Sequence, residues 1–255
     1  MWFMIRLSVN VNKIATLRNS RGGRLPNVLD AVETCVAAGA PGITVHPRAD
    51  QRHITPKDVR DIAAYLRERW PGVEFNIEGD PRAELLELVR EVQPDQCTLV
   101  PVAPGEITSH AGWRPGPASD ALAKVVADLR SRGIRVSVFV DALPASVDLA
   151  SSVAADRVEL YTEPFARAFE QGEEAGRTSF HVFADAAKQA AARGLGVNAG
   201  HDLDLANLVL FRTLPHLAEV SIGHAIVSRA VFVGLPSTPN DSELKRSGGF
   251  GRSGG

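Results

Sequence analysis

The segment G-I-T-V-H-P-R, residues 42–48, is a short β-branched run that ends in an imidazole, with a guanidinium two residues later. Other apolar runs stop in a similar way, and a helix-like segment follows most of them; the runs end at Asn10, His46, Glu78, Pro101, Asp141, Glu163, His201 and His224. Buried strands with polar, titratable ends are typical of an α/β barrel, because such a barrel builds its functional site where the strands end.

The alternation of apolar runs and helical patterns predicts eight strand–helix units. We expect strands over residues 5–11, 43–46, 73–77, 96–100, 134–140, 157–161, 195–199 and 220–222. We expect helices over 28–38, 56–69, 82–92, 118–132, 144–154, 179–192, 203–211 and 225–232, and loops over 13–26, 102–117 and 162–178. The predicted fold class is α/β, a single (β/α)8 TIM barrel with extra helical elements in its loops. It forms one catalytic domain over residues 1–235, and the tail 236–255 is predicted to be disordered.

Composition narrows the possible partners and the compartment. The chain has 255 residues, of which 44% are hydrophobic, and this suffices for one large core. Its formal net charge of −2 gives no basic field for nucleic acid or an anionic membrane, so we expect neither partner. Cys35 and Cys97 lie in apolar runs, which fits a reducing cytoplasm better than a disulfide framework. Residues 1–9 are too short and too charged for a signal peptide, and we expect them to contain the first strand.

Two strand ends offer groups that could transfer protons. His46 titrates near neutral pH, and Arg48 beside it could hold a phosphate or carboxylate. Glu78 ends a buried strand, where desolvation raises the pKa of a carboxyl and suits a general base. Asn76 is expected to point the same way and to hold Glu78. The alternatives are a capping histidine on a solvated loop and a structural ion pair in the barrel mouth.

Anion sites are predicted at the ends of the last two strands. The segments N-A-G-H-D, 198–202, and I-G-H-A, 222–225, each contain a Gly-His pair. In α/β barrels these loops often bind phosphate through backbone N–H groups and a helix N-terminus. The loop over residues 13–23 adds positive charge from Lys13, Arg18 and Arg21, although it could also be simply a solvated basic loop.

Other residues offer weaker signals. His53 could contact a ligand or merely precede a helix cap, and Thr108 lies in a long loop that could act as a lid. Glu163 could face the site or support it. The sequence has no His/Cys/carboxylate cluster with metal-ligand spacing, so we expect no metal. It also lacks a G-x-S-x-G elbow, a P-loop and a dinucleotide fingerprint.

Several segments together resemble the pyridoxine 5′-phosphate synthase family of vitamin B6 biosynthesis. They are V-N-V-N-K-I-A-T-L-R-N-S-R-G at 9–22, G-I-T-V-H-P-R-A-D-Q-R-H-I-T at 42–55, F-N-I-E at 75–78, C-T-L-V-P and E-I-T within 97–108, V-S-V-F-V-D at 136–141, V-E-L-Y-T at 158–162, V-N-A-G-H at 197–201 and I-G-H-A-I at 222–226. The order and spacing match over roughly residues 5–235, which makes the resemblance highly specific.

The resemblance implies a cytoplasmic transferase that works as a homo-octamer without metal or organic cofactor. Its two partners are small phosphorylated ketones: it condenses 1-deoxy-D-xylulose 5-phosphate with 3-amino-2-oxopropyl phosphate to pyridoxine 5′-phosphate, phosphate and water. The family pattern assigns His46 and Glu78 as proton acceptors and His201 as proton donor. It assigns the aminoketone phosphate to Asn10, Arg21, Asp202, Gly223 and His224, and the deoxyxylulose phosphate to Asn12, Lys13, Arg48, His53 and Thr108.

The chain departs from the commoner family pattern at two places. Many members have Asp-His where this chain has Asn12-Lys13, and many have Gly where it has Asp202. Lys13 keeps a cation for a phosphate. Asp202 puts a carboxylate near an anion site, although a backbone N–H contact would survive the change.

Two other functional classes remain open on the sequence. One is a different barrel enzyme acting on a single sugar phosphate, such as an epimerase or an aldolase. A Schiff-base aldolase requires a lysine at a strand end inside the barrel, and the sequence places Lys13 on a loop instead. The other is a non-catalytic barrel that only binds phosphorylated metabolites, which would not need the titratable groups at three strand ends.

Overall fold

The computed structural model describes residues 4–101 and 111–234. Within them, eight parallel strands pair in sequence order, and β8 closes onto β1 to complete the barrel. The strands are β1 (Arg6–Asn10), β2 (Gly42–Val45), β3 (Glu74–Gly79), β4 (Gln96–Leu99), β5 (Arg135–Val140), β6 (Arg157–Tyr161), β7 (Gly196–Gly200) and β8 (Leu217–Ile222). The predicted (β/α)8 barrel is therefore confirmed.

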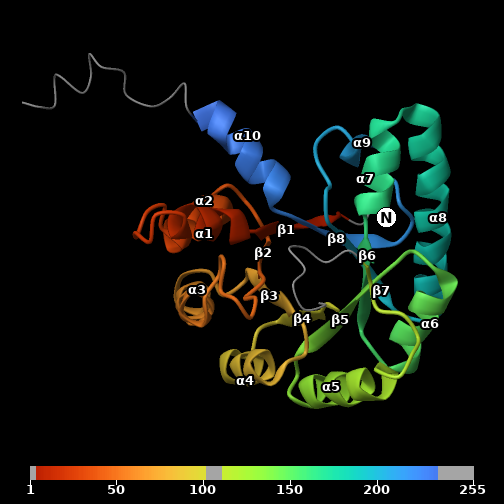
Figure 1. Ribbon diagram of the computed structural model, residues 1–255, viewed down its shortest axis with the longest axis horizontal. Helices are drawn as coiled ribbons and strands as arrows, with labels where there is room; N and C mark the ends of the chain where they lie inside the picture. Colours follow the sequence, from red (N-terminus) through yellow and green to blue (C-terminus); the bar gives the residue numbers. More distant parts are fainter. Residues whose placement is uncertain (1–3, 102–110, 235–255) are drawn as a thin grey trace, which may run out of the picture.

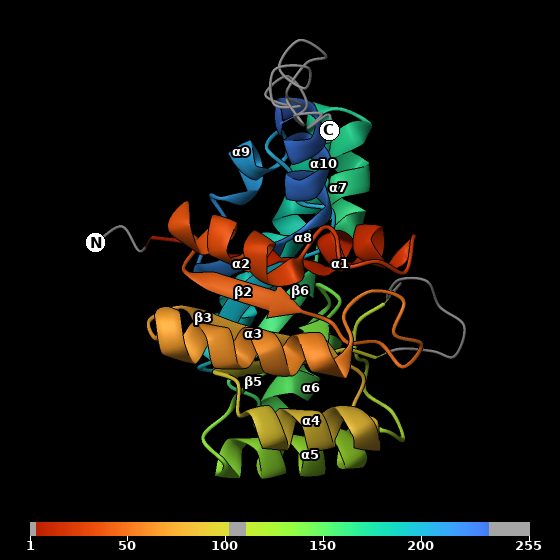
Figure 2. The same ribbon diagram turned by 90° about the vertical axis from the view of Figure 1, so that its left-hand side faces the viewer.

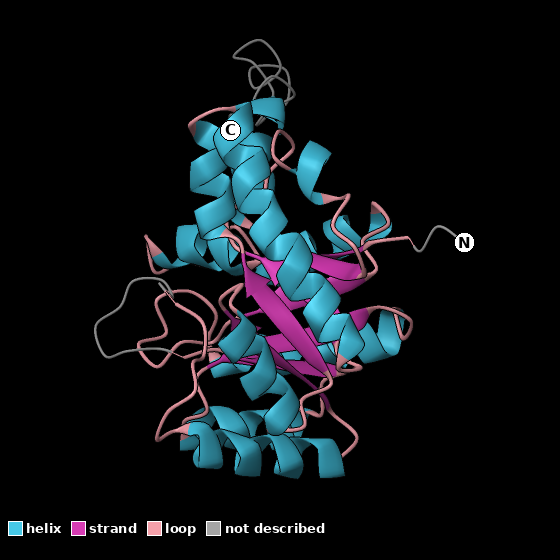
Figure 3. Cartoon of the chain, turned by 90° about the vertical axis from the view of Figure 1, so that its right-hand side faces the viewer, coloured by secondary structure: helices cyan, strands magenta, loops and turns pink. Residues whose placement is uncertain are grey.

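Helices surround this barrel (Figures 1 and 3). They are α1 (Asn12–Asn19), α2 (Val28–Ala37), α3 (Pro56–Arg69), α4 (Ala83–Val92), α5 (Ser119–Ser131), α6 (Pro144–Ser152), α7 (Glu163–Glu170), α8 (Glu173–Ala192), α9 (Leu208–Phe211) and α10 (His224–Gly234). Helices α2, α3 and α4 follow one another around the outside of the barrel (Figure 2). In the described parts of the chain, no helix is long and apolar enough to cross a membrane.

Local capping signals explain the helices that the sequence predicts well. The Thr55 side chain accepts a hydrogen bond from the backbone of Asp58, and the Asp58 carboxylate accepts one in return from the Thr55 backbone. This reciprocal capping box, with Pro56 at the first helical position, starts α3 where expected. Helix α2 has a simpler cap, in which the Asn27 side chain accepts one hydrogen bond from the backbone of Leu29.

Three connections differ from the sequence-based prediction. Helix α1 forms within the predicted loop 13–26; it buries only Ala15, so it carries no strong amphipathic pattern. The predicted connection 162–178 contains α7 and the first turns of α8, because Phe165 joins an aromatic cluster with Phe180, Phe183 and Phe211. The helix predicted over 203–211 begins only at residue 208. The tail 236–255 lies outside the described residues, and the loop 102–117 is described only from residue 111.

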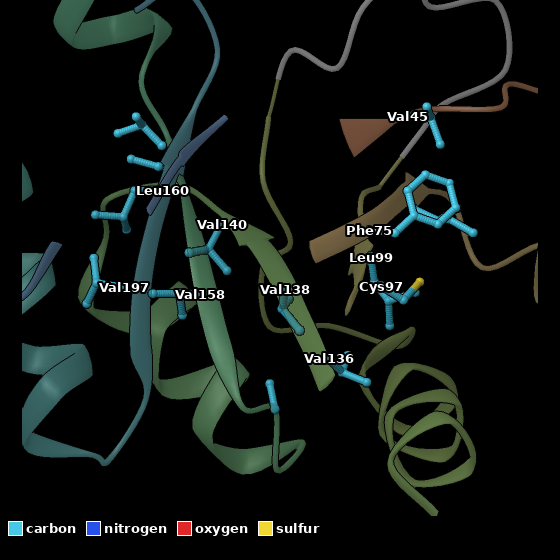
Figure 4. Close-up of a cluster of buried hydrophobic side chains, with 14 of the residues drawn as sticks. Val45, Phe75, Cys97, Leu99, Val136, Val138, Val140, Val158, Leu160 and Val197 are labelled. Carbon is cyan, nitrogen blue, oxygen red and sulfur yellow. The ribbon is translucent and has the colours of Figure 1, made fainter. Parts of the chain in front are cut away.

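The apolar core lies between the strands and the helices, not inside the barrel. Outward-facing strand residues such as Val136, Val138 and Leu160 are fully buried under the helices (Figure 4). Alternate residues point inward, and most of them are polar; those buried there include Ser8, Thr44, Asn76, Thr98, Glu159, Asn198 and Glu219. Val100, Phe139 and Tyr161 form a small separate apolar cluster. A barrel interior is more commonly filled by branched apolar side chains. The polar filling therefore supplies hydrogen-bonding groups directly below the mouth of the barrel.

Candidate active site

A cavity of about 740 Å³ opens at the carboxyl ends of the strands. All but two of the sequence-predicted site residues line it: Asn10, Asn12, Lys13, His46, Arg48, His53, Glu78, His201, Asp202, Gly223 and His224. Arg21 is exposed after the end of α1 and is not among the lining residues. Thr108 lies outside the described residues. The barrel thus brings together groups that are up to 214 positions apart in the chain, from Asn10 to His224.

His46 and Glu78 form the deep centre of this cavity. His46 Nδ1 lies 4.0 Å from Glu78 Oε2, and both side chains are about nine-tenths buried. The backbone N–H of His46 donates to Asn12 Oδ1 at 2.9 Å, which fixes the start of the loop. Burial, reinforced by the positive charge of Arg48, lowers the pKa of His46 to about 3. The imidazole is therefore neutral near pH 7 and can accept a proton.

The pKa of Glu78 shifts in the opposite direction to that of His46. Burial raises the pKa of Glu78 to about 7, and the nearby Glu219 adds to the rise. Ser221 Oγ donates to Glu78 Oε1 at 3.4 Å from the far side of the barrel, and Asn10 Nδ2 lies 3.5 Å from Oε2. A carboxyl with this pKa can both take up and release a proton at neutral pH.

The prediction that Asn76 holds Glu78 is wrong, although both side chains face the inside of the barrel as expected. Asn76 is hydrogen-bonded to Thr44 and Thr98 at 3.3 and 3.2 Å, on the two neighbouring strands. Ser221 of β8 contacts Glu78 instead.

Glu159 on β6 is a cavity residue that the sequence reasoning did not single out. Thr98 Oγ1 lies 3.4 Å from its carboxylate, and the side chain is almost fully buried. Burial together with the charges of Glu78 and Glu219 raises its pKa well above the ordinary value. A glutamate in the middle of the apolar run V-E-L-Y is the signal that could have found it. Its neighbour Glu163 instead begins α7 and pairs with Arg167 at 3.1 Å.

The rim beside β1 and β2 is positively charged. Lys13, in the first turn of α1, lines it together with Arg48, Arg52 and His53. Lys13 is thus in a helix, whereas the sequence analysis predicted that it lies in a loop. Burial and the charge of Arg48 lower the pKa of His53 to about 4, so its ring is neutral near pH 7. Its Nδ1 accepts the backbone N–H of Ile54 at 2.9 Å.

Arg18 does not belong to this rim. Its guanidinium makes a two-pronged contact with the Asp58 carboxylate at 2.6 and 2.9 Å, and both side chains are largely buried. A further N–H reaches the carbonyl oxygen of His53. Arg18 therefore joins α1 to the capped start of α3, and the predicted basic cluster over 13–23 does not act as a single anion site.

The far rim is built from the turns after β7 and β8. A Cβ atom at Gly223 would lie 2.5 Å from the carbonyl oxygen of Asn10, so only glycine fits there. Helix α10 begins at the next residue, His224, and directs its N-terminus to the cavity edge. Free backbone N–H groups at a helix N-terminus attract anions. The start of α10 therefore offers backbone N–H groups at this edge of the cavity.

The described residues contain no group of three or more His, Cys, Asp or Glu side chains able to hold a metal ion. The chemical groups that the cavity offers are a neutral imidazole, a carboxyl that titrates near neutral pH, the cations Lys13 and Arg48, and three further histidines, His53, His201 and His224. Such a set suits proton transfer on a phosphorylated substrate.

Comparison with known proteins agrees with this arrangement. Pyridoxine 5′-phosphate synthase of Bacteroides thetaiotaomicron is 50% identical over 236 residues, with 92% of this chain and 96% of that protein covered. The synthase of Xanthomonas oryzae pv. oryzae is 52% identical over 242 residues, with 92% and 93% covered.

Solved structures that resemble the chain share its fold at much lower identity. Deoxyribose phosphate aldolase of Aeropyrum pernix has a TM-score of 0.57 at 17% identity, with 90% of each chain covered. Phosphoribosylanthranilate isomerase of Thermotoga maritima has a TM-score of 0.54 at 13% identity, with 88% and 89% covered. The model of the pyridoxal phosphate biosynthesis protein PdxJ family matches residues 7–243. The chain therefore belongs to this family and is an enzyme of vitamin B6 biosynthesis.

Proposed function

We propose that the enzyme condenses 1-deoxy-D-xylulose 5-phosphate with 3-amino-2-oxopropyl phosphate to pyridoxine 5′-phosphate, phosphate and water. The observation that carries the proposal is the pair His46 and Glu78 at the bottom of one cavity that has anion-binding features on two separate rims. Two phosphorylated ketones need two such places. Imine formation, dehydration, phosphate loss and ring closure need repeated proton transfers, which several tuned groups in one cavity can supply.

The shifted pKa values of His46 and Glu78 support different roles for these two residues. His46 is neutral near pH 7 and is suited to accept a proton from a substrate carbon or nitrogen. Glu78, with its pKa raised to about 7, accepts a proton in one step and returns it in another. His201 stands at the opposite rim, where it can protonate a leaving oxygen. Separating the acceptors from the donor across the cavity keeps them from neutralising one another.

The binding roles follow from the two rims. Lys13, Arg48 and His53 lie on the β1–β2 rim and would hold the deoxyxylulose phosphate. Gly223, His224 and the backbone of Asp202 lie on the far rim and would hold the aminoketone phosphate. Asn10 and Asn12 hold Glu78 and His46 in the structure, and they would contact substrate at the same time. Arg21 and Thr108 complete the proposed set.

An aldolase or epimerase acting on a single sugar phosphate is less well supported. Lys13 is the one lysine among the described residues that line the cavity, and its side chain is exposed. A Schiff-base lysine normally needs an apolar environment to lower its pKa. A purely binding barrel would not need a histidine and a glutamate buried together at 4.0 Å.

The test is direct formation of the product. Purified protein is incubated with both phosphorylated ketones while absorbance of the pyridine ring is followed, and release of inorganic phosphate is measured in parallel. We expect both signals to rise together only when both ketones are present. Each ketone alone and the His46→Asn variant serve as controls. Phosphate release without a pyridine chromophore would show that the proposed condensation is wrong.

We further propose that the enzyme is a cytoplasmic homo-octamer, as the family resemblance implies. Helix α10 supports an assembly, because none of its residues is buried and its apolar Val231, Phe232 and Val233 are exposed. In Figure 1 this helix projects away from the barrel. Size-exclusion chromatography with light scattering tests the assembly, and a monomer at micromolar concentration would contradict it.

A further inference from the structure

The turn after β7 places an acid directly beside the proposed proton donor. His201 Nδ1 and Asp202 Oδ2 are 3.1 Å apart, and their side chains are 27% and 37% exposed. The His201 ring also meets the ring of Tyr161 edge-on, with the centroids 5.0 Å apart. The imidazole therefore contacts both an aromatic ring and a carboxylate.

The backbone of this turn has positive φ angles, which are uncommon for residues with a side chain such as Asp202. His201 and Asp202 are adjacent non-glycine residues with φ of +90° and +58°. Glycine adopts such angles without cost, whereas Asp tolerates them only moderately well. Thr162 Oγ1 donates to the carbonyl oxygen of Gly200 at 2.8 Å, and Asn207 Nδ2 donates to that of Asp202 at 2.9 Å. Asp202 therefore occupies a backbone conformation that glycine adopts more readily than any residue with a side chain.

We propose that Asp202 is a positioning residue for His201. Its carboxylate accepts a hydrogen bond from Nδ1–H, which fixes the orientation of the ring. This leaves Nε2 as the ring nitrogen that exchanges protons with a molecule in the cavity. The role of this proton in catalysis rests on the proposed function, whereas the hydrogen bond between His201 and Asp202 does not depend on it.

The charges around the pair are consistent with this role. The hydrogen bond to His201 is the largest influence on Asp202 and lowers the pKa of its carboxyl, so the acid is ionised at neutral pH. The groups that face the pair from the packed elements are Arg167 of α7, with its partners Glu163 and Glu170, together with His224 of α10 and Tyr161 of β6. Arg167 and His224 attract the same carboxylate, yet only His201 has a hydrogen bond to it among these groups in the described structure.

The first experiment measures the His201 ring without any substrate. Hydrogen–deuterium exchange at the imidazole C2 position, followed by peptide mass spectrometry over a pH series, reports when each ring loses its proton. We compare the full-length wild type with Asp202→Asn and Asp202→Gly. Both substitutions suit the positive φ, so both variants should fold. We expect the His201 exchange curve to change in each variant, while the curves of the other histidines stay as in the wild type.

The second experiment separates positioning from substrate repulsion. With both ketones, we expect Asp202→Gly to lower kcat about tenfold at pH 8 with little change in KM for the aminoketone phosphate. Asp202→Asn should keep more activity than Asp202→Gly because the amide oxygen still accepts the Nδ1–H bond. A lower KM with unchanged or higher kcat would mean that the carboxylate only repels substrate, and would overturn the proposal.

The control is Glu170→Gln. Glu170 lines the same cavity and loses the same charge, but it pairs with Arg167 and not with His201. We expect it to leave the His201 exchange curve unchanged. Equal exchange curves in the wild type and both Asp202 variants would refute the pairing. Failure of the wild type to form the pyridine product would refute the proposed function alone, because the exchange result does not depend on it.

Discussion

Replacing Glu78 with Gln tests the electrostatics of the cavity most directly. Burial raises the pKa of Glu78 from 4.5 to about 7, which corresponds to about 3 kcal/mol at about 1.4 kcal/mol per pH unit. The folded protein holds this proton more tightly than the unfolded chain does. The contribution of the group to stability is therefore full below pH 4.5 and is lost as the pH rises to about 7. Gln has the same shape but cannot ionise.

We expect the unfolding free energy of the wild type minus that of Glu78→Gln to fall by about 3 kcal/mol between pH 4 and pH 8. Urea unfolding, followed by tryptophan fluorescence at a series of pH values, measures this difference, and the chain has three tryptophans as reporters. The variant should thus gain stability relative to the wild type at pH 8. It should also lose turnover by about 10²-fold, the usual effect of removing a general base.

Glu87→Gln is the matched control, because Glu87 is an exposed glutamate on α4 outside the cavity. The difference in unfolding free energy between the wild type and Glu87→Gln should change little over the same pH range. If the difference in unfolding free energy between the wild type and Glu78→Gln did not depend on pH, burial would not raise the pKa of Glu78. Wild-type turnover in that variant would remove Glu78 from the mechanism, whatever its effect on stability.

The remaining predictions concern other residues of the site and its scaffold. His46→Asn should cut turnover by about 10²-fold or more at unchanged melting temperature, and steady-state kinetics near the wild-type rate would exclude it as a base. Lys13→Arg should keep much of the activity, whereas Lys13→Met should raise KM for one ketone; a borohydride-trapped adduct on Lys13, read by mass spectrometry, would contradict a purely electrostatic role. Arg21→Ala should weaken binding of the aminoketone phosphate by roughly 1.5–3 kcal/mol in calorimetry, and unchanged affinity for both ketones would contradict the assignment. Arg18→Ala should lower the melting temperature, because it strips the Asp58 carboxylate of a largely buried partner, and an unchanged melting curve would show that the pair adds nothing.

The sequence by itself determined the barrel and most of the cavity lining. Apolar runs that end in polar residues specify buried parallel strands, and signals such as Thr55-Pro56 specify helix starts from neighbouring residues alone. His46 and His201 could be identified because strand ends meet at one edge of a parallel barrel whatever the details of packing. Helix α1 escaped prediction for the complementary reason: with only Ala15 buried, it has no apolar stripe for a pattern to reveal.

Only the tertiary structure decided what the polar residues do. Ser221 reaches Glu78 across 143 positions of sequence, and Arg18 reaches Asp58 across 40, so neither contact leaves a local signal. The pKa values of His46 and Glu78 depend on how completely the barrel removes them from water, which no spacing in the chain encodes. The sequence thus supplied the chemical groups at the strand ends, whereas the closed barrel set their distances, burial and charge.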